Sequence, residues 1–449
     1  MLKKWRIWAV FAAIAGFVWY VIWVAPSMPV QETAQSEAPG KEQRPDAKTT
    51  ETSKKQRLAV GPAVLSPDGH SALVVFDDRI VLFDLVNGRV QKTFARHLGN
   101  VNAVAVSPDS NTALSGSSDG VVRLWDIASE REVHAFSGHS GAVTSVAFSP
   151  DGRFALSAAR DGSAILWDIA SGRKVRTFAG AGSLSDAAAL FAPDGRRMLS
   201  GACSGHGLAL WDIGSGRPLR EFNRDTYVDC PSAFSPDGRS LLVAGLYRGV
   251  KVFNVASGRL LRSAEWSSYG EGVRAFAFSS DGRSVAWGSE GGAVRLWDVA
   301  GANTLWGRIS WAFTPAVRPR RFAAQHSGEV KSVAFTADGL RILSAGGDSL
   351  IMSDVATGEA LVTLRLFTEE SWLAVTGSGF YESSVPQDVR ELRKLTTLKG
   401  LTRCSDAEIE QALHRPDLVA ENLAGDGAGK VKAAIAALDL DKACSDGPH

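Results

Sequence analysis

The chain has 449 residues and a formal net charge of +1, and 22% of its residues are charged. A charge so close to zero excludes a bulk electrostatic attraction to nucleic acid or to strongly acidic partners. The 45 glycines are typical of a folded protein with many turns. Charge therefore does not identify a partner, and we expect no nucleic acid among its ligands.

The first predicted element is an apolar segment at residues 7–25, nineteen residues without a charge, preceded by Lys3, Lys4 and Arg6. At about 1.5 Å per residue it spans most of a ~30 Å hydrocarbon core. The cations favour a cytoplasmic N-terminus. We expect residues 1–26 to be a single-pass signal anchor in the inner (plasma) membrane, with the remainder periplasmic or otherwise extracytoplasmic. The alternative, a cleaved signal peptide, changes the anchoring but not the compartment.

Residues 27–57 are polar and almost free of apolar side chains. Such a segment cannot bury enough surface to fold, so we predict a disordered linker. If it behaves as a flexible coil, its r.m.s. reach is roughly 30 Å. It would tether the folded body, which we expect to begin at residue 58, to the membrane.

A four-residue turn, Ser-Pro-Asp-Gly or a near copy, recurs seven times in residues 58–365. The copies begin at Ser66, Ser107, Ser149, Ala192, Ser235, Ser279 and Thr336. The steps between them are 41, 42, 43, 43, 44 and 57 residues. A fixed period in this range is the sequence signature of a repeat protein.

Each repeat contains four short apolar stretches separated by turns. In the third repeat, residues 143–148 and 154–157 flank the Pro-Asp-Gly turn, and Asp161-Gly162 precedes a stretch that ends in Trp167-Asp168. A further turn leads to the fourth stretch, at residues 174–178. Four strands in each of seven units predict an all-β fold, a seven-bladed β-propeller.

The end of the third strand carries a recurring aromatic-acid pair. It is Trp125-Asp126, Trp167-Asp168, Trp211-Asp212 and Trp297-Asp298, with Phe83-Asp84, Phe253-Asn254 and Ser353-Asp354 in the same slot of the other repeats. With Gly138-His139 upstream, the motifs fall in the order of a WD repeat, and residues 58–364 resemble a WD-repeat propeller.

In the family that this chain resembles, a His, a Ser, an Asp and the Trp of one repeat form a buried hydrogen-bonded set. The matching residues are His97, Ser115, Asp119 and Trp125, and His139, Ser157, Asp161 and Trp167. These sets contain the residue types of a catalytic triad, but we interpret them as structural networks that satisfy buried polar groups. The seventh repeat keeps His326, Ser344 and Asp348 but has Ser353 in the Trp slot.

The 57-residue step marks an insertion rich in aromatic residues and arginine. We predict that it lies beside three tyrosine-bearing loops on one face of the propeller and that this side of the face binds a protein partner, because aromatics with Arg make interface hot spots. The candidates are Tyr227, Tyr247, Arg248, Tyr269, Trp311, Phe313, Arg318, Arg320 and Arg321. The alternative is a lengthened outer strand whose arginines are solvated.

The four cysteines, an even number, agree with an oxidising compartment. Three pairings are open, and we prefer Cys203 with Cys230 and Cys404 with Cys444. The alternative is four free thiols in a cytoplasmic protein. No Cys-x-x-Cys motif occurs, so we expect no metal site.

After the propeller, residues 366–449 form a C-terminal extension. It contains a strand-like run within 370–380, then helical spacing at 405–413, 416–423 and 428–438. Ser405 with Glu408 predicts a capping box, and Pro416 fits a first helical turn. Three short helices hold little core alone, so docking on the propeller or a Cys404–Cys444 staple would supply what they lack.

Residues 370–442 are also similar to a segment that joins propellers to caspase-like peptidase domains in bacterial WD-repeat proteins. The sequence given ends at His449, where the peptidase would begin. The resemblance implies no activity of this chain by itself, and no catalytic residues or cofactors are expected.

We therefore predict a non-enzymatic, membrane-anchored protein-interaction scaffold. One alternative is a small-molecule-binding or enzymatic propeller that acts at its central channel, which would require a polar cluster at the channel mouth. The other is a regulatory partner of a separately encoded caspase-like peptidase.

Overall fold

The computed structural model describes residues 59–76, 78–87, 89–94, 97–179, 187–202, 208–222, 231–245, 249–264, 272–299, 320–366, 372–384, 392, 404–424 and 429–438. All of them belong to one compact unit, Lys55–His449. The predicted anchor and linker lie outside these ranges. Among the residues that the structure describes, no helix is long and apolar enough to cross a membrane.

The described strands form seven antiparallel sheets, the blades, and each takes its strands consecutively from the chain. Blades 1 to 3 contain β1 (Val60–Leu65), β2 (Ser71–Phe76), β3 (Arg79–Asp84), β4 (Arg89–Thr93), β5 (Val101–Val106), β6 (Thr112–Ser117), β7 (Val121–Asp126), β8 (Glu132–Ser137), β9 (Val143–Phe148), β10 (Phe154–Ala159), β11 (Ser163–Asp168) and β12 (Arg173–Ala179). Blades 4 to 6 contain β13 (Ala187–Phe191), β14 (Arg197–Ala202), β15 (Leu208–Asp212), β16 (Pro218–Phe222), β17 (Ser232–Phe234), β18 (Ser240–Gly245), β19 (Gly249–Asn254), β20 (Leu260–Ala264), β21 (Val273–Phe278), β22 (Ser284–Ser289), β23 (Ala293–Asp298) and β24 (Arg320–Gln325). Blade 7 contains β25 (Val330–Phe335), β26 (Arg341–Gly346), β27 (Ser349–Asp354), β28 (Ala360–Leu366), β29 (Trp372–Thr376) and β30 (Tyr381–Ser383).

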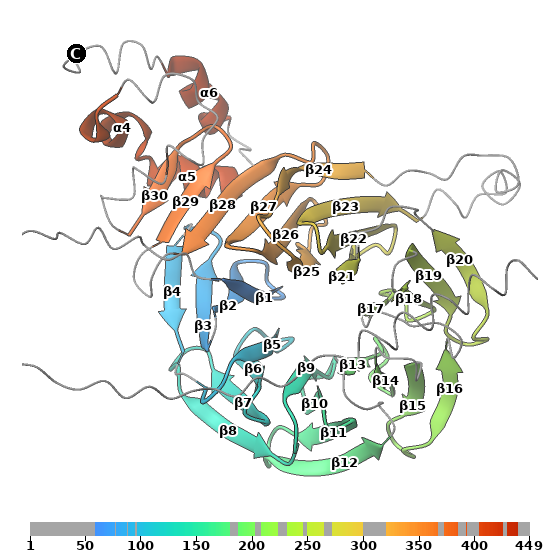
Figure 1. Cartoon of the computed structure of the whole chain (residues 1–449). Coiled ribbons are helices and arrows are strands. Elements are labelled where there is room, and N and C mark those ends of the chain that lie inside the picture. The colour runs from blue at the N-terminus through green and yellow to red at the C-terminus, as the bar shows by residue number, and fades with distance from the viewer. Residues whose placement is uncertain are drawn as a thin grey trace, which may run out of the picture. The chain divides into compact units, whose positions relative to one another are not determined.

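The blades follow one another around a ring, with the first strand of each blade innermost (Figure 1). The prediction of seven four-stranded units is confirmed for blades 1 to 6, and blade 7 has six strands. The ring closes without strand exchange. Instead, the Val60 amide donates to the Gly347 carbonyl at 2.9 Å and the Ala63 amide to Ser332 Oγ at 2.8 Å.

The Pro-Asp-Gly turns form because the first residue and the Asp close a hydrogen-bonded ring. In blade 3, Ser149 Oγ donates to Asp151 Oδ1 at 2.5 Å and accepts from the Phe154 amide at 2.9 Å. Gly152 has φ +71, a conformation that glycine adopts without strain. In blade 4 the first residue of the turn is Ala192, which has no hydroxyl group to donate to Asp194. There Arg197 Nε donates to Asp194 Oδ2 at 2.7 Å.

Neighbouring blades pack through aromatic rings. The outer strand of one blade ends in a Phe that meets the aromatic residue at the end of the next blade's third strand. The pairs, with their centroid distances, are Phe94–Trp125 at 6.0 Å, Phe136–Trp167 at 5.4 Å, Phe178–Trp211 at 5.6 Å and Phe222–Phe253 at 5.8 Å. The recurring Trp is therefore a core residue between blades.

The last sheet continues from the propeller into the C-terminal extension, because β29 pairs antiparallel with β28 and β30 with β29. Side chains of β29 alternate between two cores. Trp372 and Ala374 pack with residues of blades 1 and 7, whereas Leu373 and Val375 pack with residues of the helices. The strand predicted near residue 372 thus joins the propeller to its extension.

The three predicted helices are present as α4 (Asp406–Leu413), α5 (Pro416–Leu423) and α6 (Lys430–Ala437). The Ser405–Glu408 capping box is formed, and Pro416 lies in the first turn of α5. Arg341 of β26 donates to the carbonyls of Leu423 and Ala424, at 2.6 and 2.9 Å. These carbonyls end α5 and have no partner within the helix, so the extension is docked on blade 7.

Candidate interaction surfaces

The predicted network of blade 3 is assembled inside the blade. Trp167 Nε1 donates to Ser157 Oγ at 2.8 Å, and Ser157 Oγ lies 2.8 Å from His139 Nε2. His139 Nδ1 lies 3.0 Å from Asp161 Oδ2. Ser157 and the His139 side chain are 0% exposed. No substrate reaches such a serine, so the set links strands and loop rather than performing nucleophilic catalysis.

Blade 2 brings the same four residue types together, with one addition. Trp125 Nε1 and His97 Nε2 both contact Ser115 Oγ, at 2.7 and 2.6 Å. Arg123 Nη1 contacts His97 Nδ1 and donates to Asp119 Oδ2 at 2.9 Å. The His97 Nδ1 to Asp119 Oδ2 distance is consequently 3.5 Å, longer than in blade 3. The arginine, which sequence reasoning missed, takes the place of Ile165 in blade 3 and is visible in the sequence as a charge within an apolar strand.

Blade 7 uses a different partner for its histidine. His326 Nε2 lies 2.8 Å from Ser344 Oγ, and Nδ1 lies 3.0 Å from Ser349 Oγ. Asp348 instead accepts from Ser327 Oγ at 2.7 Å and from Arg365 Nη1 at 3.0 Å. The three residues predicted for this repeat are therefore close together, but His326 and Asp348 do not contact each other directly. Through Arg365, the fourth strand β28 also bonds to this set.

Burial decides the charge of the histidines. It lowers the pKa of His97 to about 4, with the nearby Arg123 acting in the same direction. Burial also lowers the pKa of His326 to about 4 and that of His139. Burial alone would raise the pKa of Asp161, but hydrogen bonds from Ser163 and from backbone amides outweigh it and lower the pKa. Near neutral pH the imidazoles are neutral and Asp161 is ionised.

We predict that Ser157→Ala lowers the free energy of unfolding by about 2–3 kcal/mol, because His139 and Trp167 both lose their partner inside a closed blade. Urea unfolding followed by circular dichroism measures the change. The exposed Ser171, which bonds Asp168 in a turn of the same blade, is the matched control, and we expect less than about 1 kcal/mol for Ser171→Ala. Equal losses in the two variants would contradict a structural role for the network.

The propeller has two faces that carry different connections. We call the face with the Pro-Asp-Gly turns and the links between third and fourth strands the turn face. The opposite face, with the links between second and third strands and between blades, is the loop face. Tyr227, Tyr247 with Arg248, and Tyr269 belong to links that join strand ends at the loop face, and these residues lie outside the described ranges.

The insertion departs from the turn face. β23 and β24 pair antiparallel, with Ala293 opposite Gln325 toward the loop face and Leu296 opposite Arg320 toward the turn face. The insertion joins these third and fourth strands, so both its ends are on the turn face. The prediction that it lies beside the tyrosine-bearing loops is therefore wrong for its two ends. The error arose because the outer strand follows the insertion instead of preceding it.

Of the candidates on the turn-face side, Arg320 and Arg321 are described and both are exposed, whereas Trp311, Phe313 and Arg318 lie outside the described residues. Arg320 Nη1 donates to the Ala356 carbonyl of blade 7 at 2.7 Å, and its guanidinium carbon lies 5.6 Å from the Phe322 ring centroid. Arg320 is thus engaged between two blades.

This contact recurs at three other junctions, those that follow blades 1, 3 and 4. The cation two residues before the outer-strand Phe reaches the turn between third and fourth strands of the next blade. Lys92 donates to Ile127 and Ala128 carbonyls, Arg176 to Gly214 and Ser215, and Arg220 to Ala256 and Ser257. Gly216 has φ +70, and a Cβ there would collide with Arg176. The repeated cation was a sequence signal that could have identified this inter-blade contact.

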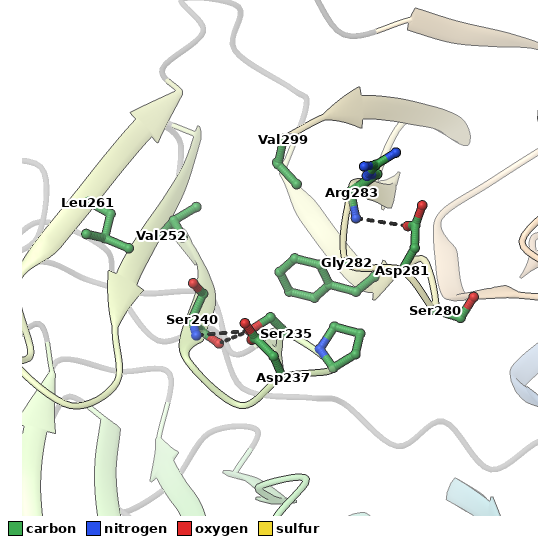
Figure 2. Close-up of a pocket in the computed structure, with 12 residues that line it drawn as sticks. Ser235, Asp237, Ser240, Val252, Leu261, Ser280, Asp281, Gly282, Arg283 and Val299 are labelled. Carbon is green, nitrogen blue, oxygen red and sulfur yellow. Dashed lines mark hydrogen bonds between the residues drawn. The ribbon is translucent and has the colours of Figure 1, made fainter. Parts of the chain in front are cut away.

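A cleft of about 570 Å³ lies on the turn face between blades 5 and 6 (Figure 2). Val252, Leu261, Phe278 and Val299 contribute its apolar lining. Carboxylates from two Pro-Asp-Gly turns, those of Asp237 and Asp281, contribute charge. Val299 is the last described residue before the insertion.

Two polar features are found at the described inner strands. Arg274 of β21 pairs with Glu290 and, at 3.0 Å, with Glu329, which ties blade 6 to blade 7. Lys331 and Asn102 line a small cavity of about 260 Å³ between blades. In the described part of the chain, no group of three or more His, Cys, Asp or Glu side chains is placed to hold a metal ion.

Among the cysteines, only Cys404 falls in the described ranges. It is disulfide-bonded and packs in the core formed by β29, β30 and the helices. Cys203, Cys230 and Cys444 lie outside the described residues, so the pairing of Cys404 with Cys444 and of Cys203 with Cys230 remains a prediction.

A comparison with known protein families matches the model described as "WD domain, G-beta repeat" at residues 88–126, 130–168, 261–298 and 318–352. Each match runs from the outer strand of one blade through the third strand of the next. The networks of blades 2 and 3 fall inside the first two matches. No curated protein matches the chain.

Proposed function

Because this chain is a WD40-repeat protein with a seven-bladed β-propeller, we propose that it is a non-enzymatic protein-interaction scaffold held at the inner membrane by residues 7–25. In this proposal the propeller faces the periplasm and carries its partners on the irregular blades 4 to 6. The observation that carries the proposal is a difference in accessibility between the Ser-His-Asp sets and the surface of blades 5 and 6. The Ser-His-Asp sets are closed inside blades, whereas a lined cleft opens between blades 5 and 6.

The two faces offer separate groups of candidate contacts. The loop-face group is Tyr227, Tyr247, Arg248 and Tyr269, and the turn-face group is Trp311, Phe313, Arg318 and Arg321. Arg320 is left out of the second group because its guanidinium contacts Ala356 and its loss would weaken blade packing. The division allows each face to be tested alone.

Crosslinking and affinity purification of the full chain from intact membranes tests the proposal. We expect specific protein partners, and we expect alanine substitution of one group to remove a partner that the other group retains. Arg320→Ala is the matched control for stability and should keep the partners while costing about 1 kcal/mol. Recovery of no specific protein, or unchanged recovery in both variants, would count against the scaffold and its assigned surfaces respectively.

Membrane anchoring and orientation need their own measurement. We expect the chain to fractionate with the inner membrane and its propeller to be cut by protease added to the periplasmic side. Replacing residues 7–25 with a cleavable signal sequence should release the propeller as soluble protein. Protection from protease on that side would contradict the proposed orientation.

A further inference from the structure

The junction between blades 5 and 6 differs from other junctions in the sequence that follows the third strand of the second blade. At three of the preceding junctions, those that follow blades 1, 3 and 4, a Lys or Arg of the outer strand is bonded to the next blade's turn between third and fourth strands. The turns that they contact have an Asp or Asn followed three positions later by a Ser, as in Asp212 with Ser215 and Asn254 with Ser257. Blade 6 has Gly301 at the position of this Ser, in a segment outside the described residues.

The floor of this cleft is apolar. Val252 comes from the third strand of blade 5, Val299 directly follows the third strand of blade 6, and Phe278 comes from the end of β21. Leu261 of the outer strand is 51% exposed and lies in the same lining. An exposed leucine inside a cleft, beside other apolar side chains, offers a surface on which an apolar group of a ligand can pack.

Two carboxylates at the cleft keep an oxygen available. Asp237 Oδ1 accepts from Ser235 Oγ at 2.5 Å and from the Arg239 amide at 3.0 Å. Asp281 Oδ1 accepts from Ser279 Oγ at 2.6 Å and from the Arg283 amide at 2.9 Å. Among the described residues, neither Oδ2 atom receives a hydrogen bond in these turns, whereas Asp194 Oδ2 of blade 4 is taken by Arg197. Hydrogen bonds from these serines are the main cause of the lowered pKa of both carboxyls.

Among the described lining residues the charge is therefore net negative, with the carboxylates of Asp237 and Asp281 and the guanidinium of Arg283. A negative rim above an apolar floor complements a cation next to a hydrophobic side chain. A volume of about 570 Å³ is within the usual range for binding pockets, and it suits a few residues of a peptide rather than a folded domain.

We propose that this cleft binds an extended segment of a partner protein that presents an Arg or Lys beside a Leu or similar aliphatic residue. The cation pairs with Asp237 and Asp281, and the aliphatic side chain packs on Leu261 and Phe278. This site rests on the proposed scaffold function and assigns the chemistry of one partner contact. It is distinct from the tyrosine-bearing loop face.

The test uses the purified full chain in detergent and two fluorescent peptides, Gly-Ala-Leu-Arg-Leu-Ala-Gly and its counterpart with Glu in place of Arg. We expect saturable binding of the Arg peptide by fluorescence anisotropy, and binding of the Glu peptide that is weaker by at least about tenfold. The double variant Asp237→Asn, Asp281→Asn should weaken the Arg peptide by a similar factor. Leu261→Ser should weaken both peptides.

Asp151→Asn is the matched control, because Asp151 makes the same turn contacts in blade 3 but lies outside the cleft. It should leave peptide binding unchanged. The proposal is overturned if the Arg peptide does not saturate, if the two peptides bind equally, or if Asp151→Asn weakens binding as much as the double variant. It is also overturned if binding appears only in a chain lacking residues 303–317, since the cleft would then be taken by the chain itself. Partners still recovered from membranes by the double variant would preserve the scaffold function while rejecting this site.

Discussion

Replacing Trp372 with alanine is expected to lower the free energy of unfolding by about 3–5 kcal/mol, the usual loss for a large aromatic side chain in a core. Trp372 is 8% exposed and meets Phe83 of blade 1 edge-on, with ring centroids 6.4 Å apart. Its cluster includes Met352 and Val362 of blade 7 and Val419 of α5. The side chain therefore connects the first blade, the last blade and the C-terminal extension.

The position is important because the outer strand of blade 7 has no Phe to meet Phe83 of blade 1. Leu364 is opposite Leu350 in that strand, where blades 2 and 3 have Phe136 and Phe178, and it is buried. The junctions from blade 1 to blade 5 hold ring pairs such as Phe136–Trp167, while the closing junction obtains its second ring from Trp372 of β29, beyond the last four-stranded unit. In repeat architectures each unit contacts only its neighbours, so loss of Trp372 should weaken the ring at this junction first.

Urea unfolding followed by circular dichroism gives the stability change, and hydrogen exchange measured by mass spectrometry locates it. We expect faster exchange in β1, β28 and β29 and little change in β10 of blade 3. Trp372→Phe is the matched control and should lose less than about 1.5 kcal/mol, because it keeps an aromatic ring in the core. A loss below about 1 kcal/mol in the alanine variant, or equal acceleration around the ring, would contradict the closing role of β29.

The elements that could be predicted from the sequence depend on local chemistry. The Ser149–Asp151 turn, the Ser405–Glu408 cap and Pro416 in a first turn each require only residues a few positions apart, and each is present. The period of the turns then determined the number of blades. The buried networks followed from the repeat pattern because their members have fixed spacing within one blade.

Contacts between blades were harder to predict because their partners are about forty residues apart and the spacing varies. Arg320 was selected as a partner-binding residue for its charge, whereas its guanidinium bonds the turn carbonyl of Ala356. Arg123 changes the His97 network from within a strand that reads as apolar. The face from which the insertion departs depends on which strand it precedes, and the 57-residue step alone does not contain that information.

The same difficulty applies to the C-terminal extension. Its resemblance to a segment that joins propellers to peptidase domains suggests a separate connecting piece. Here Val419 and Leu423 of α5 pack in the core of blades 1 and 7, and Asn422 Nδ2 donates to the Leu361 carbonyl at 2.6 Å. Docking, one of the two predicted sources of stability for the short helices, is confirmed, so this segment contributes to the propeller itself.

Lowering the pH from 6.5 to 4 is expected to destabilise the propeller through its buried histidines. In the unfolded chain a histidine binds its proton near pH 6.5, whereas burial holds the pKa of His97 and of His326 at about 4 in the folded protein. Between these values the unfolded state binds more protons, so stability falls as the pH falls. Each histidine contributes a loss of about 2–3 kcal/mol by pH 4.

Carboxylates act in a lower window, which separates the two effects. The pKa of Asp161 lies below its ordinary value of 3.8, because hydrogen bonds outweigh the opposing effect of burial. Its stabilisation is present above pH 3.8 and is lost only as the pH falls through the lowered folded-state pKa. A stability profile by urea unfolding should therefore slope between pH 6.5 and 4 because of the histidines and decline further below pH 4 because of the aspartates.

The double variant His97→Gln, His326→Gln removes two of the three buried network histidines and should reduce the slope of the profile between pH 6.5 and 4, even if its stability at pH 7 is lower. His139, whose pKa burial also lowers, should keep part of the slope. His70→Gln, at an exposed residue of the blade 1 turn, is the matched control and should keep the slope. An unchanged slope in the double variant would show that other groups produce the acid sensitivity. Retention of the full slope by only one of the two single variants would identify which blade, the second or the seventh, opens first on protonation.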